Sequence, residues 1–356
     1  MEIIDRGLIF DADSAAPPRR CCCFTHLRRL GDGRILSIFR LGSGKDTADG
    51  NCVVARSDDD GATWENVSEG FGRVLDGRDG EIREADVWEI DGAALGATMT
   101  WVDRSAGDCI FDMDTEAILP TRVASARSTD GGRTWSRPRA IDTGEMNNMV
   151  LTGSGLSVPG RGYVSLTENF QQQEDGSEAV HTSNALFTTD GVSFGPPATV
   201  TRHPQDRVFY WDQRQALCPR TGRAVGFFWT WDRGAKKDLP IHAAWGDAET
   251  LRWQNVFSTG VTGQIAAPIP LTDGRLLMFY VRREAPGGMR LIASGDDGRT
   301  WDEAGGITIY EAQTDLSIWS FGHPAAVILD DGTLLLSHYG GPEADRLAVH
   351  WARLRV

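Results

Sequence analysis

The octet Ser57-Asp58-Asp59-Asp60-Gly61-Ala62-Thr63-Trp64 has the pattern Ser-x-Asp-x-Gly-x-Thr-Trp. The pattern returns at residues 128–135 and at residues 294–301, each time after a short apolar or alternating run, as in the turn of a β-hairpin. Its Asp can accept hydrogen bonds from backbone N–H groups, its Gly supplies a positive φ, and its Trp can anchor the turn on a sheet. Three copies in one chain predict a repeated β-structure.

A second period supports the first. At intervals of roughly 50 to 70 residues a glycine is followed by a hydrophobic strand, at Gly33, Gly92, Gly162, Gly222, Gly274 and Gly332. Short strands and Gly-rich turns repeated at this spacing are typical of a β-propeller. We therefore predict an all-β fold, a six-bladed β-propeller of four-stranded antiparallel blades, as a single domain over residues 1–356. The strands within residues 3–10 should pair with residues 347–354 and close the ring, which removes free sheet edges.

Composition narrows the class of protein. The formal net charge of −14 argues against a nucleic-acid or anionic-membrane partner. The sequence has no run of 18 apolar residues, and its start lacks the basic and apolar regions of a secretory signal, so we expect a cytoplasmic location. The six cysteines lack zinc-ligand spacing and are expected to be reduced, buried thiols, with no metal or cofactor. The oligomeric state is left open.

The repeated octets are not the predicted active site. In a propeller such turns belong to the outer hairpins, so Trp64, Trp135 and Trp301 are expected to be buried packing residues. Chemistry should gather at the axial mouth, where inner strands begin and second strands run out into loops. The polar residues at those positions include Lys45, Arg83, Glu84, Glu168, Asn169, Gln264, Arg283, His338 and Tyr339.

The fourth repeat is the richest in such residues. Its segments Tyr210–Arg214 and Trp229–Arg233 both join Trp, Asp and Arg. Tryptophan faces stack on sugar rings, and paired Arg and carboxylate groups bind hydroxyls and anions. The two segments therefore predict a carbohydrate or a small anionic sugar as ligand.

A ring of these octet turns, known as Asp boxes, resembles the sialidase (neuraminidase) superfamily of BNR-repeat proteins. The resemblance implies a clamp of three arginines for a substrate carboxylate, a Tyr–Glu nucleophile and an Asp acid/base. Asp46 or Asp49 occupies the stretch before the first Asp box that holds this Asp, and Arg282 fits the third arginine. The chain departs from the pattern elsewhere: Cys23-Phe24-Thr25 stands at the first arginine motif, and the segment Trp319–His323 has no tyrosine. The departures indicate that the fold is kept while the chemistry has moved.

Three function classes follow. The first is a glycoside hydrolase on an acidic or deoxy sugar that uses paired axial carboxylates. The alternatives are a polysaccharide lyase on a uronate, with His242, His323, His338 or Tyr339 moving protons, and a non-catalytic carbohydrate-binding propeller. The predicted catalytic residues are Asp46, Asp49, Asp212, Asp232 and His242, with Asp212 as base or activator and Asp46 as acid. The predicted substrate-binding residues are Arg40, Arg214, Arg233, Arg282, Trp211, Trp231 and His323.

Overall fold

The computed structural model describes the chain from residue 1 to residue 356 except residues 92–93, 113–115, 173–178, 313–316 and 318–319. Gly92 and Trp319, both used above, lie outside the described residues. The described part is almost entirely strand and turn, with two short 3-10 helices, η1 (Ala12–Ser14) and η2 (Arg104–Ala106). The prediction of an all-β chain is confirmed. Among these residues no helix has the length and apolar character needed to cross a membrane.

Successive strands pair antiparallel with one another in meanders. The first meander contains β2 (Cys21–Arg29), β3 (Ile35–Gly42), β4 (Asn51–Ser57) and β5 (Glu65–Ser68). After the small hairpin of β6 (Val74–Leu75) and β7 (Arg78–Asp79), the next contains β8 (Glu81–Asp91), β9 (Ala94–Val102), β10 (Thr121–Ser128) and β11 (Arg139–Ala140). The third contains β12 (Met149–Leu151), β13 (Leu156–Val158), β14 (Gly162–Gln171), β15 (Val180–Thr188) and β16 (Ala198–Thr201).

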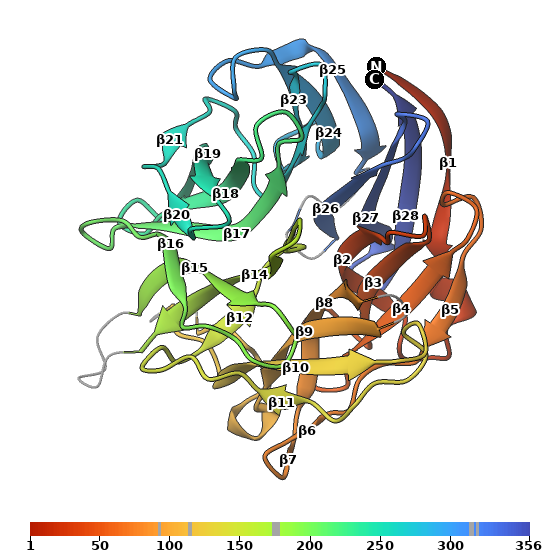
Figure 1. Cartoon of the computed structure of the whole chain (residues 1–356), viewed down its shortest axis with the longest axis vertical. Coiled ribbons are helices and arrows are strands. Elements are labelled where there is room, and N and C mark those ends of the chain that lie inside the picture. Colours follow the sequence, from red (N-terminus) through yellow and green to blue (C-terminus); the bar gives the residue numbers. More distant parts are fainter. Residues whose placement is uncertain (92–93, 113–115, 173–178, 313–316, 318–319) are drawn as a thin grey trace.

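The second half of the chain repeats this arrangement. One meander contains β17 (Val208–Leu217), β18 (Ala224–Asp232), β19 (Lys237–Asp247), β20 (Arg252–Trp253) and β21 (Phe257–Ser258). It is followed by β22 (Ala266–Pro270), β23 (Leu276–Arg282), β24 (Gly288–Ser294) and β25 (Asp302–Glu311). The last meander contains β26 (Phe321–Ile328), β27 (Leu334–Glu343) and β28 (Arg346–Arg355). Figure 1 shows these sheets arranged around a common centre, near which β2, β8, β17 and β26 lie.

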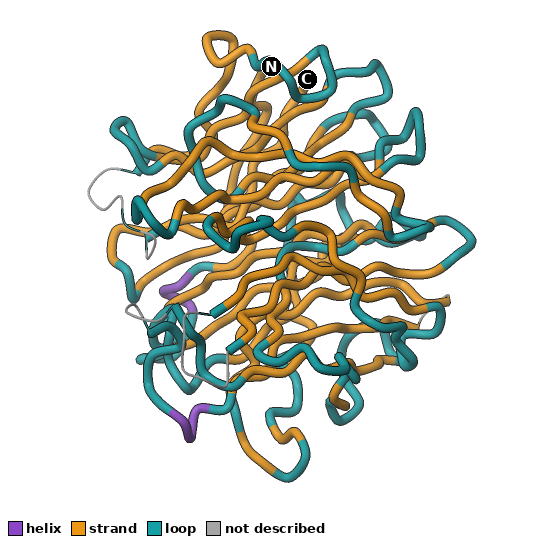
Figure 2. The backbone as a smooth tube through the Cα atoms, turned by 90° about the vertical axis from the view of Figure 1, so that its left-hand side faces the viewer, coloured by secondary structure: helices purple, strands orange, loops and turns teal. Residues whose placement is uncertain are grey.

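The chain termini join the first and last parts of the fold. The N-terminal strand β1 (Glu2–Phe10) pairs antiparallel with β28 over most of its length, from Glu2 opposite Arg355 to Phe10 opposite Val349. The two termini consequently lie side by side, as Figures 1 and 2 show. The predicted pairing of N- and C-terminal strands is confirmed, and it covers the outer edge of β28.

The three octet turns have the predicted local structure. In each, the Asp carboxylate accepts hydrogen bonds from the backbone N–H and the hydroxyl of the Thr, at 2.8 and 2.6 Å in the first copy. The glycines Gly61, Gly132 and Gly298 have φ values of 87°, 90° and 84°, which L-residues rarely adopt. The three tryptophans are partly buried rather than fully buried, because each covers the rim of a core cluster from the outside.

The core lies between neighbouring sheets. Apolar side chains of adjacent meanders form its largest cluster, in which Leu36 and Val54 of the first meander pack with Val87 and Met99 of the second. Cysteine contributes as predicted at Cys21, Cys22, Cys23 and Cys52, which are buried thiols. Cys109 and Cys218 differ from the prediction, since Cys109 is exposed and Cys218 is only partly buried.

Candidate active site

The strands nearest the centre share an irregularity. Their pairing registers shift at matching places, between Cys23 and His26, Ile82 and Glu84, Trp211 and Arg214, and Gly322 and Ala325. Phe24, Asp212 and His323 at three of these shifts have φ values of 54°, 47° and 50°, an uncommon conformation for residues with a Cβ. A bulge redirects the side chain that it carries. Here the redirected side chains meet: the Phe24 ring lies 4.7 Å from the His323 ring and 4.8 Å from the Arg83 guanidinium.

Two carboxyl groups lie together at the centre. Glu168 Oε2, on β14, accepts a hydrogen bond of 3.1 Å from the backbone N–H of Asp212 on β17. The same oxygen lies 2.9 Å from His181 Nε2 on the neighbouring strand β15. Glu168 is 7 % exposed. Burial and then the negative charge of Asp212 raise the pKa of Glu168 well above its usual range.

Asp212 has a different electrostatic environment. Burial raises its pKa, but the guanidinium of Arg214, at 3.7 Å from Asp212 Oδ1, acts in the opposite direction. The charges of Lys45 and Arg83 also lower the pKa of Asp212, while that of Glu84 raises it. Two carboxyl groups whose surroundings separate their pKa values divide the roles of acid and base. The pKa of Asp212 is raised overall, like that of Glu168, but Arg214, Lys45 and Arg83 favour the ionised form of Asp212, whereas the charge of Asp212 opposes ionisation of Glu168.

Positive groups from β17 itself, from β8 and from the loop after β3 surround the pair: Arg214, Arg83 and Lys45. Arg214 Nη2 lies 2.7 Å from His323 Nδ1 on β26, and burial followed by the Arg214 charge keeps the pKa of His323 well below its usual value. Lys45 Nζ donates to the Tyr339 hydroxyl at 2.8 Å. Burial lowers the pKa of Lys45 to about 8. The two carboxyl groups are therefore surrounded by positively charged side chains and by a histidine whose pKa favours its neutral form.

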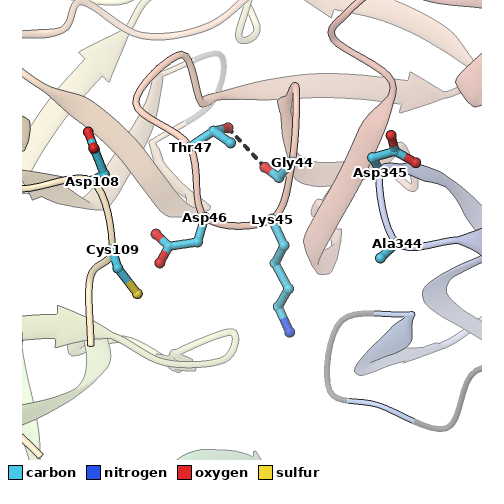
Figure 3. A pocket seen from close by; sticks show the side chains of 8 residues that line it. All are labelled: Gly44, Lys45, Asp46, Thr47, Asp108, Cys109, Ala344 and Asp345. Atoms are coloured by element: carbon cyan, nitrogen blue, oxygen red, sulfur yellow. Dashed lines mark hydrogen bonds between the residues drawn. The ribbon is translucent and has the colours of Figure 1, made fainter. Parts of the chain in front are cut away.

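A cavity of about 490 Å³ opens beside this cluster. The loop from Gly44 to Thr47, which follows β3, forms its middle (Figure 3). Asp108 and Cys109 line one side, while Ala344 and Asp345 line the other. Lys45 belongs both to this lining and to the charge environment of Asp212, whereas Glu168 and Asp212 themselves do not line the cavity.

The loop that carries Lys45 is held by a buried ion network. Arg40 is fully buried, and it donates to Glu81 at 2.6 Å and to the backbone oxygens of Gly44 and Thr47 at 2.5 and 2.7 Å. Arg104 bridges Glu81 and Asp46, at 2.5 Å from each. We predicted that Arg40 binds the ligand, but its side chain has no accessible surface. Its donors instead hold the loop in place from the protein interior.

The two candidate aspartates of this loop are also engaged. Asp46 accepts from Arg83 at 3.0 Å and from the Ile110 N–H at 2.9 Å. Although burial raises the pKa of Asp46, Arg83 and these hydrogen bonds hold it below its usual value. Asp49 accepts from Ser43 and Thr47 within the loop, and these bonds outweigh burial and lower its pKa. A carboxyl group with a lowered pKa is a poor general acid at neutral pH.

The two segments of the fourth repeat pair directly with each other on β17 and β18, but their Asp and Arg side chains have different partners. Asp232 pairs with Arg207 at 3.2 Å and accepts from the Ala235 N–H, so it closes a turn. Arg233 pairs with Glu116 and lies 4.6 Å from the Phe209 ring. Asp232 and Arg233 are thus engaged at the end of β18, whereas Arg214 of the first segment lies 3.7 Å from Asp212 in the carboxyl pair.

The remaining predicted residues lie around the mouth or outside it. Trp211 and Trp231 stack at 5.7 Å with an interplanar angle of 12°, and both are partly exposed. His242 lies 2.9 Å from the Pro240 oxygen and packs near the Tyr210 ring. Arg283 rather than Arg282 faces the centre, donating to the Gln264 side chain and to the Phe321 oxygen. Neighbouring residues of a strand face opposite sides, so a shift of one position reverses the side chain.

Sequence reasoning placed Glu168, Glu84, Lys45 and Arg83 at the axial mouth but did not select them as site residues. A signal for Glu168 exists, since it is the one charged residue in the strand from Gly162 to Gln171. A carboxyl group in such a run needs a functional or paired role. His181 carries no such signal, because its contact with Glu168 depends on strand pairing. Among the described residues no group of three or more Cys, His, Asp or Glu side chains could hold a metal ion.

Comparisons with known proteins identify the type of fold. No protein-family model matches the chain, and no curated protein matches it. Solved structures do match along the full chain. A protein of unknown function from Dyadobacter fermentans has a TM-score of 0.75 and 17 % identity and covers 100 % of this chain and 99 % of its own.

Two further matches have named activities. The α-L-arabinanase of Penicillium chrysogenum, solved with arabinobiose, has a TM-score of 0.66 and 16 % identity and covers 99 % of this chain and 98 % of its own. The intramolecular trans-sialidase of Ruminococcus gnavus, solved with oseltamivir carboxylate, has a TM-score of 0.65 and 12 % identity and covers 100 % and 98 %. The chain thus has the sialidase-like β-propeller fold predicted from its sequence.

Proposed function

We propose that this protein is a glycoside hydrolase whose active site is the Glu168–Asp212 pair at the axial mouth. The observation that carries the proposal is the hydrogen bond from the Asp212 backbone N–H to the Glu168 carboxyl group. It brings together two buried acids with raised pKa values, that of Glu168 lying well above its usual range. Hydrolysis of a glycosidic bond requires such a pair, one protonated and one ionised. The likeness in fold to an arabinanase and a trans-sialidase supports a carbohydrate-active enzyme.

In this proposal Glu168 is the general acid. Its proton passes to the glycosidic oxygen as the bond to the anomeric carbon breaks, and the carboxylate of Asp212 stabilises the positive charge that develops on the sugar. Asp212 then acts either as a nucleophile or as the base for water. This revises the sequence-based assignment of Asp46 as the acid, because Arg83 and Arg104 stabilise the ionised form of Asp46.

We propose an acidic or deoxy sugar as the substrate. Arg214, Lys45 and Arg83 supply positive charge around the pair, and Arg214 Nη1 is a buried donor without a hydrogen-bond partner in the described structure. Such a donor is suited to a carboxylate or hydroxyl of the ligand. Trp211 and Trp231 offer an aromatic surface next to Asp212 on which the apolar face of a sugar can stack.

A lyase acting on a uronate is the second candidate. It is favoured by the contact of Lys45 with the Tyr339 hydroxyl and by the neutral His323 beside Arg214, since a lyase needs a cation for the carboxylate and a group that moves a proton. The products distinguish the two reactions. A lyase forms an unsaturated uronate with ultraviolet absorbance, whereas a hydrolase forms a reducing sugar without it.

We also propose that the propeller has six blades. The proposal is supported by the repeated pairing of four successive strands, from β2–β5 through β26–β28, with β1 as the fourth strand of the last set. Among the residues that the structure describes, the backbone pairing between β28 of the last set and β2 of the first is a single parallel bridge between Leu347 and Cys21. An experimental structure with another blade number would contradict it.

The test of the function is a screen of the purified protein on aryl glycosides and on uronate polymers, followed by Asp212→Asn. This change keeps the shape of the side chain and removes its charge, so the variant should melt near the wild-type temperature and lose turnover. The matched control is Asp232→Asn, on the strand β18 that pairs with β17. Full activity of Asp212→Asn, or equal losses in both variants, would contradict the proposed site.

A further inference from the structure

A second set of reactive groups lies beside the carboxyl pair. Ser154 Oγ is 3.2 Å from His26 Nδ1, and the opposite ring nitrogen, Nε2, is 2.8 Å from Glu84 Oε1. These residues come from the first three sheets, Ser154 from the loop between β12 and β13, His26 from β2 and Glu84 from β8. A hydroxyl, an imidazole and a carboxylate in hydrogen-bonded series are the groups that activate a serine nucleophile.

The loop that carries Ser154 is built to present it. Ser154 is partly exposed, while the two residues on either side of it are buried. Gly153 has a φ of 35°, and a Cβ there would lie 2.6 Å from Arg214 Nη1. A Cβ at Gly155 would lie 2.2 Å from the Val164 oxygen. Only glycine on both sides of Ser154 therefore allows this close approach of the turn to its neighbours.

The turn is also fixed from behind. The Gly155 N–H donates to Asp86 Oδ2 at 2.8 Å, and Arg28 donates to the Gly155 oxygen at 3.0 Å. The Tyr163 hydroxyl and Arg28 in turn contact Asp86, which is fully buried. A nucleophile needs a position set by rigid neighbours, and this network supplies it.

An anion-stabilising donor is present as well. Arg214 is 4 % exposed, and its Nη1 has no hydrogen-bond partner in the described structure. Because a Cβ on Gly153 would lie 2.6 Å from this nitrogen, Arg214 Nη1 lies next to the residue that precedes Ser154. Acyl transfer through a serine requires a donor of this kind for the oxyanion of the tetrahedral intermediate.

We infer that Ser154, His26, Glu84 and Arg214 form an acyl-transfer site that hydrolyses a short O-acyl ester carried by a sugar. A sugar ester is favoured because Arg214 also faces Asp212, so that the two sites share one ligand-binding region. A short acyl group is favoured because Ser154 is only partly exposed between buried residues.

The reaction balances with water as the only co-reactant. Ser154 Oγ attacks the ester carbonyl carbon while its proton moves to His26 Nδ1, and Arg214 binds the resulting oxyanion. The carbon–oxygen bond to the sugar then breaks, and His26 returns the proton to the leaving sugar oxygen. Water attacks the acyl-serine with His26 as base, which releases the carboxylic acid and restores Ser154. Glu84 orients the imidazole throughout.

The test uses the full chain with a fluorophosphonate reagent and with 4-nitrophenyl acetate. We expect one labelled serine, identified as Ser154 by peptide mass spectrometry, and a loss of at least ~100-fold in ester hydrolysis for Ser154→Ala. The matched control is Ser157→Ala, an exposed serine three residues away on β13. Both variants should retain the wild-type melting temperature.

Two results would overturn the inference. One is a wild-type protein that is not labelled, or is labelled at another serine. The other is a rate of acetate release that is the same in Ser154→Ala and Ser157→Ala. Neither result bears on glycoside hydrolysis, which depends on Glu168 and Asp212. Conversely, the labelling of Ser154 does not require glycoside turnover, so the two proposals fail separately.

Discussion

Replacement of Glu168 by Gln tests the division of roles in the carboxyl pair. Gln has nearly the same shape, and its amide oxygen can still accept the 3.1 Å hydrogen bond from the Asp212 N–H. It cannot deliver a proton to the leaving group. General acid catalysis contributes roughly 10²–10⁴-fold, so we expect kcat on an alkyl glycoside to fall by that factor. We expect the fold to be unaffected, because burial raises the pKa of Glu168 and so favours the uncharged form that Gln resembles.

Substrates with different leaving groups distinguish loss of the general acid from a general loss of activity. A glycoside with a strongly acidic phenol as leaving group needs little protonation, so Glu168→Gln should hydrolyse it with a much smaller loss. Asp212→Asn should lose activity on both substrates, because the charge of Asp212 is needed whichever group leaves.

The pH dependence supplies a second readout. Because burial raises the pKa of Glu168, wild-type activity should decline as the pH rises through that pKa and the acid loses its proton. This alkaline decline should disappear in Glu168→Gln. The assay is kcat against pH for both leaving groups. Equal losses on the two substrates, or an unchanged alkaline limb in the variant, would refute the assignment of Glu168 as the acid.

Three further outcomes are expected from single substitutions. Arg40→Ala removes one of the two arginines that pair with the fully buried Glu81 carboxylate and should reduce the free energy of unfolding by about 3–5 kcal/mol in urea titrations. A loss below about 1 kcal/mol would show that Arg104 alone is sufficient. Trp135→Ala removes a ring that packs 4.8 Å from the Phe71 ring and should lower the free energy of unfolding by about 3 kcal/mol in the same assay, with activity retained at permissive temperature. Loss of ligand binding at unchanged stability would contradict the structural role of Trp135. Burial lowers the pKa of His338 to about 3, below the unfolded value of about 6.5, so the unfolded state binds more protons and the stability of the fold declines as the pH falls from about 6.5 to about 3. His338→Phe should weaken this decline, measured as melting temperature against pH. An unchanged pH dependence in the variant would contradict the prediction.

The sequence determined the repeated architecture because its signals are local. The conformation of each octet turn depends on residues within four positions of one another, such as Asp59 and Thr63, so the pattern alone specifies the hydrogen bonds. The pairing of the chain ends followed from the same period, since the last repeat lacks a strand that residues 3–10 supply. The composition of the axial mouth was likewise readable, because repeat position indicates which strand end a residue occupies.

Only the tertiary structure decided which of those residues act together. The sequence does not distinguish Asp46 from Asp212. In the structure Arg83 and Arg104 form ion pairs with Asp46, whereas burial beside Glu168 raises the pKa of Asp212. The register shifts that redirect Asp212 and the equivalent residues of the other inner strands have no sequence motif, because a bulge depends on the partner strand. Contacts between residues of different sheets depend on how the sheets pack around the centre. For that reason the fold could be predicted from the sequence and the pairing of charges at its centre could not.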